Sequence, residues 1–295
     1  MNFKIIKVNI QRLRDRATPI FGIFTGVILM LNSCTEKIDI DLGTTYTRFV
    51  VDGAITTDTM KHIVRLSKSI DYYSQTDIPA VSNAEVSVSD GFSTVMLDEN
   101  DSVPGLYETA GDYFGVPGRT YTLNIELTEA INGQTSFSAS SYLNEVAPID
   151  SINVEYKPEW EAWELQIYAW DPPTVNFYMF DVYKNGDWIT DTINEVGISD
   201  DKYFNGNFTY GAAVYYFIEE NPDEVVNPGD TIVLRMAGIT EEYYHFVYDV
   251  MMETFEFRNP LFSGPPANIS TNISNGGMGF FTAYAVSYAT TVYEE

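Results

Sequence analysis

Residues 121–127 read Tyr-Thr-Leu-Asn-Ile-Glu-Leu, and this stretch decides the fold class. Apolar and polar side chains alternate along it, so Tyr121, Leu123, Ile125 and Leu127 fall on one face of a β-strand. Such alternation is expected where one face of an antiparallel sheet is buried and the other meets water. The stretch therefore predicts a strand whose apolar face lies in a core.

Similar strand signals recur at short spacing through the rest of the chain, with turn residues between them. Residues 84–89 alternate in the same way and lead into Asp90-Gly91, which favours a type I′ hairpin because both central positions need positive φ. Asn132-Gly133 and Asn185-Gly186 are further hairpin signals. Many short strands between turns are typical of a sandwich or barrel, so we predict a mainly β protein.

The chain is long enough for two domains, and residues 146–150 carry a boundary signal. Pro148 removes a ladder donor and holds Ala147 in extended geometry, which suits a short stiff joint. We therefore expect two antiparallel β-sandwich domains, an immunoglobulin-like one at residues 45–147 and a second at residues 148–295.

One segment, residues 240–257, departs from the β pattern. Thr240 can cap a helix, acidic residues follow at its positive end, and Asn259-Pro260 stops it. Its apolar residues recur at helical spacing: Tyr243, Phe246, Val247, Val250 and Met251. We predict one helix that fills the open side of the second domain.

The charge balance excludes one class of partner. Sixteen Lys and Arg stand against 42 Asp and Glu, for a net charge of −26. Such a surface repels phosphate backbones, so we expect no nucleic-acid binding. Hydrophobic residues make up 45% of the chain, enough for a core, and a lone Cys allows neither an intrachain disulfide nor a cysteine-rich metal site.

The N-terminus has the pattern of a targeting segment. A basic region precedes the short apolar run 20–31, which falls below the ~20 residues of a membrane span, so residues 1–33 are predicted to be a signal peptide. Leu31-Asn32-Ser33-Cys34 resembles the bacterial lipobox, which predicts cleavage before Cys34 and lipid on its sulfur. An ordinary signal peptide with a chance Cys is the alternative.

Residues 34–44 would then form a lipidated tether, and their sequence permits two interpretations. The acidic stretch at residues 35–41 resembles in part the surface-export signal of Bacteroidota lipoproteins. It is equally compatible with a plain solvated tether. We expect an outer-membrane protein anchored through lipid on Cys34 and exposed at the cell surface, with the periplasmic face as the alternative.

Catalytic motifs are absent from the sequence. His62 and His245 lie far apart, neither has the partner of a zinc-hydrolase motif, and no nucleophile elbow or phosphate loop occurs. We therefore predict no catalytic residues, no metal and no cofactor. The acidic residues 98–101 could hold calcium, but they lack the usual spacing and are interpreted as a solvated hairpin tip.

Aromatic residues supply the candidate contact surface. The four tryptophans could form a platform for a sugar ring, but we expect them to pack the second core: Trp160, Trp163, Trp170 and Trp188. The segment 203–217 is rich in Gly and Asn as well as rings, so not every ring can point inward. We take its aromatics as a candidate partner face: Tyr203, Phe204, Phe208, Tyr210, Tyr215 and Tyr216.

Motifs at both ends of the mature chain suggest a family. Residues 49–53 read Phe-Val-Val-Asp-Gly, and Asn259-Pro260-Leu261-Phe262 leads to the Ala-Asn-Ile of residues 267–269 and the Gly-Gly-Met-Gly-Phe-Phe of residues 276–281. Together with the lipobox they resemble the Bacteroidota outer-membrane lipoprotein family known as domain of unknown function 4249. The first sandwich also resembles a carboxypeptidase-regulatory or transthyretin-like module.

This resemblance implies a function without catalysis. Members of such families are often encoded beside TonB-dependent receptors, which implies a binding or scaffold subunit of a nutrient-uptake complex with such a receptor as partner. The alternative is a free-standing lipoprotein that binds a glycan or peptide through segment 203–217. A hydrolase that uses a carboxylate pair is a third hypothesis, since fold alone does not fix function.

Overall fold

The computed structural model describes residues 47–70, 76–254 and 269–294. The predicted signal peptide, Cys34 and the predicted tether lie outside these residues, and so does the last part of the predicted helix. Residues 45–295 form one compact unit.

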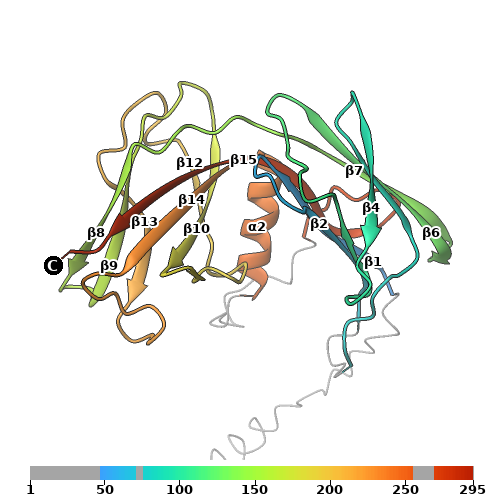
Figure 1. Cartoon of the computed structure of the whole chain (residues 1–295), viewed down its shortest axis with the longest axis horizontal. Helices are drawn as coiled ribbons and strands as arrows, with labels where there is room; N and C mark the ends of the chain where they lie inside the picture. Colours follow the sequence, from blue (N-terminus) through green and yellow to red (C-terminus); the bar gives the residue numbers. More distant parts are fainter. Residues whose placement is uncertain (1–46, 71–75, 255–268, 295) are drawn as a thin grey trace, which may run out of the picture. The chain divides into compact units, whose positions relative to one another are not determined.

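The fold is mainly β with one helix, as predicted (Figure 1). Twelve strands form one sheet in the order β11-β10-β14-β15-β1-β2-β5-β4-β3-β6-β7, with β12 beside β10, and three strands form a second sheet in the order β13-β9-β8. The first-half strands are β1 (Phe49–Thr56), β2 (Ile63–Lys68), β3 (Glu85–Ser89), β4 (Thr94–Glu99), β5 (Leu106–Glu108), β6 (Thr120–Ile131) and β7 (Gln134–Tyr142). The second half contains β8 (Ser151–Lys157), β9 (Ala162–Tyr168), β10 (Phe177–Lys184), β11 (Asp187–Trp188), β12 (Gly197–Asp200), β13 (Ala212–Ile218), β14 (Thr231–Ile239) and β15 (Met278–Val292).

The first core confirms the alternation in residues 121–127. All four of the alternating apolar residues are buried, and they belong to one cluster with β1, β2, β3 and β7. Phe49 and Phe137 pack there with ring centroids 4.4 Å apart. The sheet curls back on itself, because the Ala283 amide of β15 donates to Ser141 Oγ beside the end of β7.

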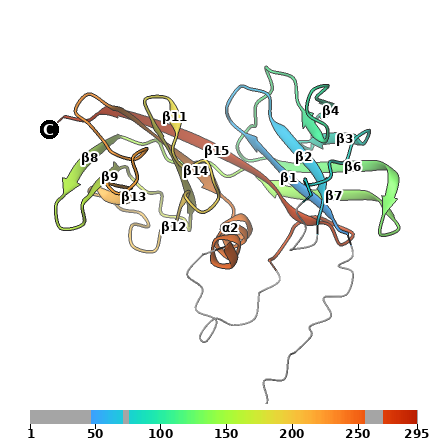
Figure 2. The same ribbon diagram turned by 90° about the horizontal axis from the view of Figure 1, so that it is seen from below.

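Strand β15 belongs to both halves of the molecule. Its first part pairs in parallel with β1, from Val50↔Met278 to Thr56↔Tyr284, and its second part pairs antiparallel with β14. It is the long red strand in Figures 1 and 2. The chain thus passes from the first core to the second near residue 147 and returns at residue 278, so the sheet continues across the predicted boundary. The parallel pair differs from the antiparallel pairing expected throughout.

Two of the three hairpin predictions are confirmed, and one is wrong. Asn132-Gly133 and Asn185-Gly186 have positive φ at both residues and join directly paired strands, as a type I′ turn requires. The prediction for Asp90-Gly91 is wrong, because β3 and β4 pair at Ser89↔Thr94 and four residues connect them. Asp90 Oδ1 accepts hydrogen bonds from the Phe92 and Ser93 amides, so the aspartate side chain itself organises this turn.

The predicted helix is α2 (Glu241–Thr254), and Thr240 caps it as expected. Thr240 Oγ1 accepts a 3.2 Å hydrogen bond from the Tyr243 amide. The position of α2 differs from the prediction that it fills the open side of the second domain. Its Tyr243 packs on Phe280 and Tyr284 of β15. This is the face of the large sheet that points away from the second core, because Met236 of β14 faces that core and Ala237 joins the cluster under the helix.

Candidate binding site on the three-stranded sheet

The three-stranded sheet has one face in the second core and one face outside it. Along β9, Trp163, Leu165 and Ile167 belong to the core, so the alternate residues Glu164 and Gln166 lie on the outer face. Both polar residues are buried although they lie outside the core. Something on the outer face must therefore cover them and satisfy their hydrogen bonds.

A side-chain network on the outer face meets that need, and Gln166 is its centre. Gln166 Nε2 donates to Glu164 Oε1 at 2.7 Å and to Glu155 Oε2 at 3.0 Å. Gln166 Oε1 accepts from Asn153 Nδ2 at 3.3 Å and from the Tyr168 hydroxyl at 3.2 Å. The amide thus uses both its donors and both its acceptor sites, which fixes its orientation.

Aromatic rings stand at one end of this network. Trp160, in the turn before β9, is 57% exposed and meets Tyr216 of β13 edge to face, with ring centroids 5.5 Å apart. The Tyr216 hydroxyl donates to Glu164 Oε2 at 3.2 Å. The preceding Lys157 forms an ion pair with Glu155 at 2.8 Å. Rings and charged groups therefore adjoin one another on the same surface.

A second aromatic group stands at the other end. Phe208 lies between Trp170 and Tyr210, with centroid distances of 5.4 and 5.1 Å, and 6.4 Å from Tyr168. Trp170 is 63% exposed and Tyr210 is 80% exposed. Tyr210 also has a φ of 53°, an uncommon value for a residue with a ring. The local backbone thus holds this ring in solvent.

We call these six side chains and the network between them the outer aromatic face: Trp160, Tyr168, Trp170, Phe208, Tyr210 and Tyr216. Strand β9 has seven residues and a rise of ~3.3 Å per residue, so the two ends are about 20 Å apart. Exposed rings with polar groups between them are typical of contact surfaces, because they combine a large apolar area with directional hydrogen bonds.

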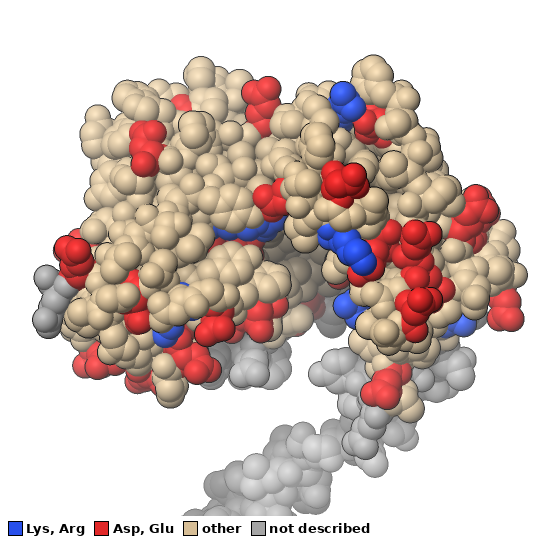
Figure 3. Space-filling view, viewed as in Figure 1, with Lys and Arg blue, Asp and Glu red and all other residues tan. Residues whose placement is uncertain are grey.

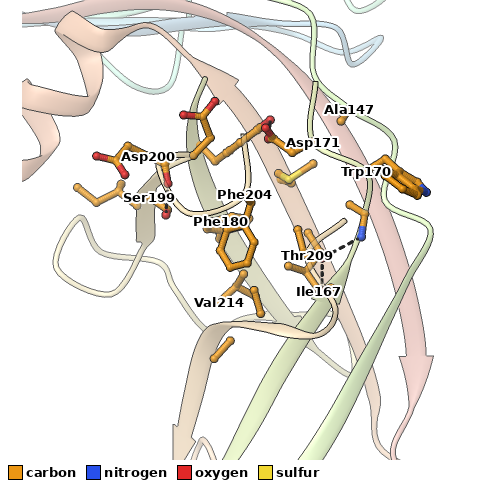
Figure 4. A pocket seen from close by; sticks show the side chains of 17 residues that line it. Ala147, Ile167, Trp170, Asp171, Phe180, Ser199, Asp200, Phe204, Thr209 and Val214 are labelled. Carbon is orange, nitrogen blue, oxygen red and sulfur yellow. Dashed lines mark hydrogen bonds between the residues drawn. The ribbon is translucent and has the colours of Figure 1, made fainter. Parts of the chain in front are cut away.

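The inner face of the same sheet borders a cavity of about 170 Å³ (Figure 4). Its walls come from β9 and β13 on one side and from β10, β12 and β14 on the other. Apolar residues dominate the lining: Ala147, Ile167, Ala169, Trp170, Phe180, Ile198, Phe204, Ala212, Ala213, Val214 and Met236. The Trp170 indole extends away from the other side chains in this view, toward the outer side.

Two buried carboxylates lie at the cavity, Asp171 and Asp201. Asp171 Oδ1 accepts from the Tyr178 hydroxyl at 2.6 Å, and Oδ2 accepts from the Gly206 amide at 3.3 Å. Asp201 Oδ2 accepts from the Asn176 amide at 2.7 Å and from Asn205 Nδ2 at 3.1 Å. These bonds attach the loops that follow β9 and β12 to each other.

Burial and hydrogen bonding act in opposite directions on the pKa of Asp171. Burial raises the pKa of Asp171, the hydrogen bond from Tyr178 opposes that effect, and the nearby Asp201 adds to it. Burial likewise raises the pKa of Tyr178, and its bond to Asp171 acts in the same direction. The Tyr178 hydroxyl is therefore a hydrogen-bond donor at neutral pH.

The six residues of the predicted partner face do not form one surface. Phe208, Tyr210 and Tyr216 belong to the outer aromatic face, whereas Phe204 lines the cavity. Tyr215 packs against the second core, because it alternates with Tyr216 along β13. Tyr203 is 89% exposed on the loop that follows β12.

The predicted role of the tryptophans is correct for Trp163 and wrong for the others. Trp163 belongs to the second core. Trp160, Trp170 and Trp188 are each about half exposed or more. Trp160 occupies the turn before β9, where strand alternation does not direct a side chain into the core. Trp170 forms a β-bridge with Phe208, and because the preceding Ala169 faces the core, Trp170 faces outward.

The two histidines lie in different surroundings. His62 is buried, and its Nδ1 accepts from the Thr56 amide at 3.3 Å, so Nε2 carries the proton and donates to the Asp58 carbonyl at 3.1 Å. Burial lowers its pKa. His245 is exposed on α2, 3.7 Å from Glu241.

The acidic stretch 98–101 has protein partners for its most enclosed member. The two carboxylate oxygens of Glu99 accept from the amides of Gly105 and Asn83, at 2.9 and 2.8 Å. Among the described residues no cluster of His, Cys, Asp or Glu has the arrangement of a metal site. The described part of the chain also contains no helix long and apolar enough to cross a membrane.

A buried ion pair that was not predicted from the sequence lies on the sheet face that carries α2. Arg235 of β14 lies opposite Asp181 of β10 in the strand register, and its Nη1 is 2.6 Å from Asp181 Oδ2. On its other side, Arg235 Nε donates to the Tyr288 hydroxyl, which donates to Asp58 Oδ2 at 2.7 Å. Isolated charges in apolar strands were the only signal, and they do not reveal which strands are neighbours.

A mainly β fold of two connected cores, with aromatic rings exposed on one sheet, defines the class of this protein. Its family follows from comparison with known proteins: the model of the family Domain of unknown function (DUF4249) matches residues 35–290. The chain therefore belongs to that family. A search of curated proteins found no match.

Proposed function

We propose that this protein is a lipid-anchored outer-membrane lipoprotein and a non-catalytic binding or scaffold subunit of a TonB-dependent nutrient-uptake system. The observation that carries the proposal is Cys34, the lone Cys of the chain, directly after a short apolar run and a small residue. The family match supports it, because the family model covers residues 35–290 and so begins directly after Cys34.

Burial of acyl chains in the bilayer is the interaction that would hold this protein at a membrane. Each buried CH₂ contributes about 0.8 kcal/mol, so several acyl chains on Cys34 would give stable anchoring. The folded body does not favour attraction to anionic headgroups, since the net charge is −26 and acidic side chains outnumber basic ones on the face drawn in Figure 3.

The outer aromatic face is the surface that we assign to the partner. Its exposed rings need no partner for folding, and burying Trp170 and Tyr210 would remove large apolar areas from water. The polar network beneath them, centred on Gln166, holds the surface rigid, which limits the entropy lost on binding.

Three measurements test this proposal. Mass analysis of the native protein should find residues 1–33 removed and acyl chains on Cys34, and Cys34→Ser should release the protein from membranes. Pull-down from detergent-solubilised membranes should then recover a TonB-dependent receptor. An unmodified Cys34 contradicts the anchor, and recovery of the lipoprotein alone contradicts the partnership.

A free-standing lipoprotein that binds a glycan or peptide is the second candidate. The two ring groups about 20 Å apart favour it, because an extended ligand could contact both. Tyr210→Ala combined with Tyr216→Ala should weaken binding in a glycan or peptide array. Tyr203→Ala is the matched control, since Tyr203 is as exposed but lies outside the outer aromatic face.

A carboxylate-dependent hydrolase is the least supported candidate. Asp171 and Asp201 are the two buried carboxylates beside the cavity. The cavity of about 170 Å³ is close to the size that holds one benzene molecule, which leaves little room for a glycoside and its attacking water. Hydrolysis of a panel of glycosides that is lost in Asp201→Asn would support this candidate over the other two.

A further inference from the structure

Two carboxylates at the cavity on the inner face of the three-stranded sheet differ from other buried carboxylates of the molecule, because they have no positively charged partner among the described residues. Asp90 is buried, and Arg119 Nη1 lies 2.5 Å from its Oδ2. Asp181 is buried, and Arg235 Nη1 lies 2.6 Å from its Oδ2. In both places a guanidinium compensates the carboxylate, which is the usual arrangement for a buried charge.

Asp171 and Asp201 have no such partner. In the described parts of the chain no Lys, Arg or His forms an ion pair with either of them, and their hydrogen bonds come from neutral donors. The nearby Lys202 pairs instead with Asp200 at 2.5 Å. The two buried carboxylates therefore leave a negative potential at one side of the cavity.

The rest of the cavity is apolar and small. The walls are aliphatic and aromatic side chains, among them Phe180, Phe204 and Val214. A volume of about 170 Å³ is close to that of an engineered ~150 Å³ apolar cavity that binds benzene. Ala213 and Trp170 line the cavity and are also exposed, so the cavity lies close to the molecular surface.

We propose that this cavity binds a small organic ammonium ion, with its cationic nitrogen at Asp171 and Asp201 and an apolar body of about the size of a benzene ring between β9, β13 and β10. Charge complementarity selects the ammonium group, and the apolar walls select the body. This site lies on the inner face of the three-stranded sheet, and it adjoins the outer aromatic face at Trp170, which also lines the cavity.

Isothermal titration of the mature chain tests the assignment with two probes of one shape. Benzylammonium should bind at neutral pH, and the neutral isostere benzyl alcohol should bind at least tenfold more weakly, because it lacks the charge that the carboxylates attract. This comparison needs no variant. Equal binding of the two probes, or no binding of either, would overturn the proposal.

A pair of variants places the ammonium group within the protein. Asp171→Asn keeps the shape of the side chain and should weaken benzylammonium binding at least tenfold, while benzyl alcohol binding stays unchanged. Asp187→Asn removes one acidic charge from the exposed Asn185-Gly186 hairpin and should change neither. An equal loss in both variants would indicate long-range attraction rather than a site, and would contradict the proposal.

Discussion

The Tyr178 hydroxyl donates a 2.6 Å hydrogen bond to Asp171 Oδ1, and both side chains are buried. Tyr178 is on β10 and Asp171 follows β9, so this bond ties the three-stranded sheet to the large sheet across the second core. The same carboxylate accepts from the Gly206 amide and so also holds the loop after β12. One aspartate thus connects the segment that follows β9, strand β10 and the loop that follows β12.

Removing that hydroxyl should destabilise the protein. Tyr178→Phe leaves a buried carboxylate short of a donor, and an unsatisfied buried group costs about 1–3 kcal/mol. Urea denaturation should show this loss as a lower midpoint with an unchanged slope. Tyr203→Phe is the control and should have no measurable effect, because Tyr203 is fully accessible to water. Equal midpoints for Tyr178→Phe and the wild type would refute this role.

Removing one partner of the buried Arg235–Asp181 ion pair should strongly destabilise the protein. Arg235→Met leaves Asp181, with only 3% of its side chain exposed, without its counter-charge, and such a loss costs about 3–5 kcal/mol. Lys61→Met is the control, since the Lys61–Glu108 pair is exposed and worth about 1 kcal/mol or less. The double variant Arg235→Met with Asp181→Leu should recover much of the stability. A double variant less stable than Arg235→Met would contradict this account.

Gly279 should tolerate no side chain, whereas Gly276 should tolerate one at moderate cost. Both have positive φ, at 85° and 76°. A Cβ on Gly279 would lie 1.9 Å from the Val51 carbonyl oxygen, but one on Gly276 would meet nothing within 4 Å. Gly276→Ala should therefore cost about 1–2 kcal/mol from backbone strain alone. Gly279→Ala should lose more, because it forces β1 and β15 apart, and thermal denaturation of both variants would rank them.

Asp90 should contribute to the loss of folding stability at low pH. Burial alone would raise its pKa, but hydrogen bonds from the Ser93 and Phe92 amides and from Arg119 outweigh that effect and lower the pKa to about 2. Since the folded pKa is below the unfolded value of about 3.9, the stabilisation is complete above pH ~4 and is lost as pH falls toward 2. The melting temperature of Asp90→Asn should therefore change less over this range than that of the wild type. Parallel curves would contradict the assignment.

The candidate site shows where prediction from sequence stopped. Tyr215 and Tyr216 belonged to one predicted face, but adjacent strand residues point to opposite sides, and only pairing with β9 decides which side is the core. Trp160 and Trp170 were expected in the core on hydrophobicity alone. Trp160 lies outside it in a turn, and Trp170 lies outside it because the alternation past Ala169 directs its side chain to the outer face.

Local patterns determined the fold class, the alternation of β6, two type I′ turns and the capped helix, because each depends on the conformational preferences of residues next to one another. The tertiary structure alone decided that β15 pairs with both β1 and β14, that Arg235 meets Asp181, and that Asp171 and Asp201 share one cavity. Those contacts join residues tens to hundreds of positions apart, and no local preference encodes which strands become neighbours.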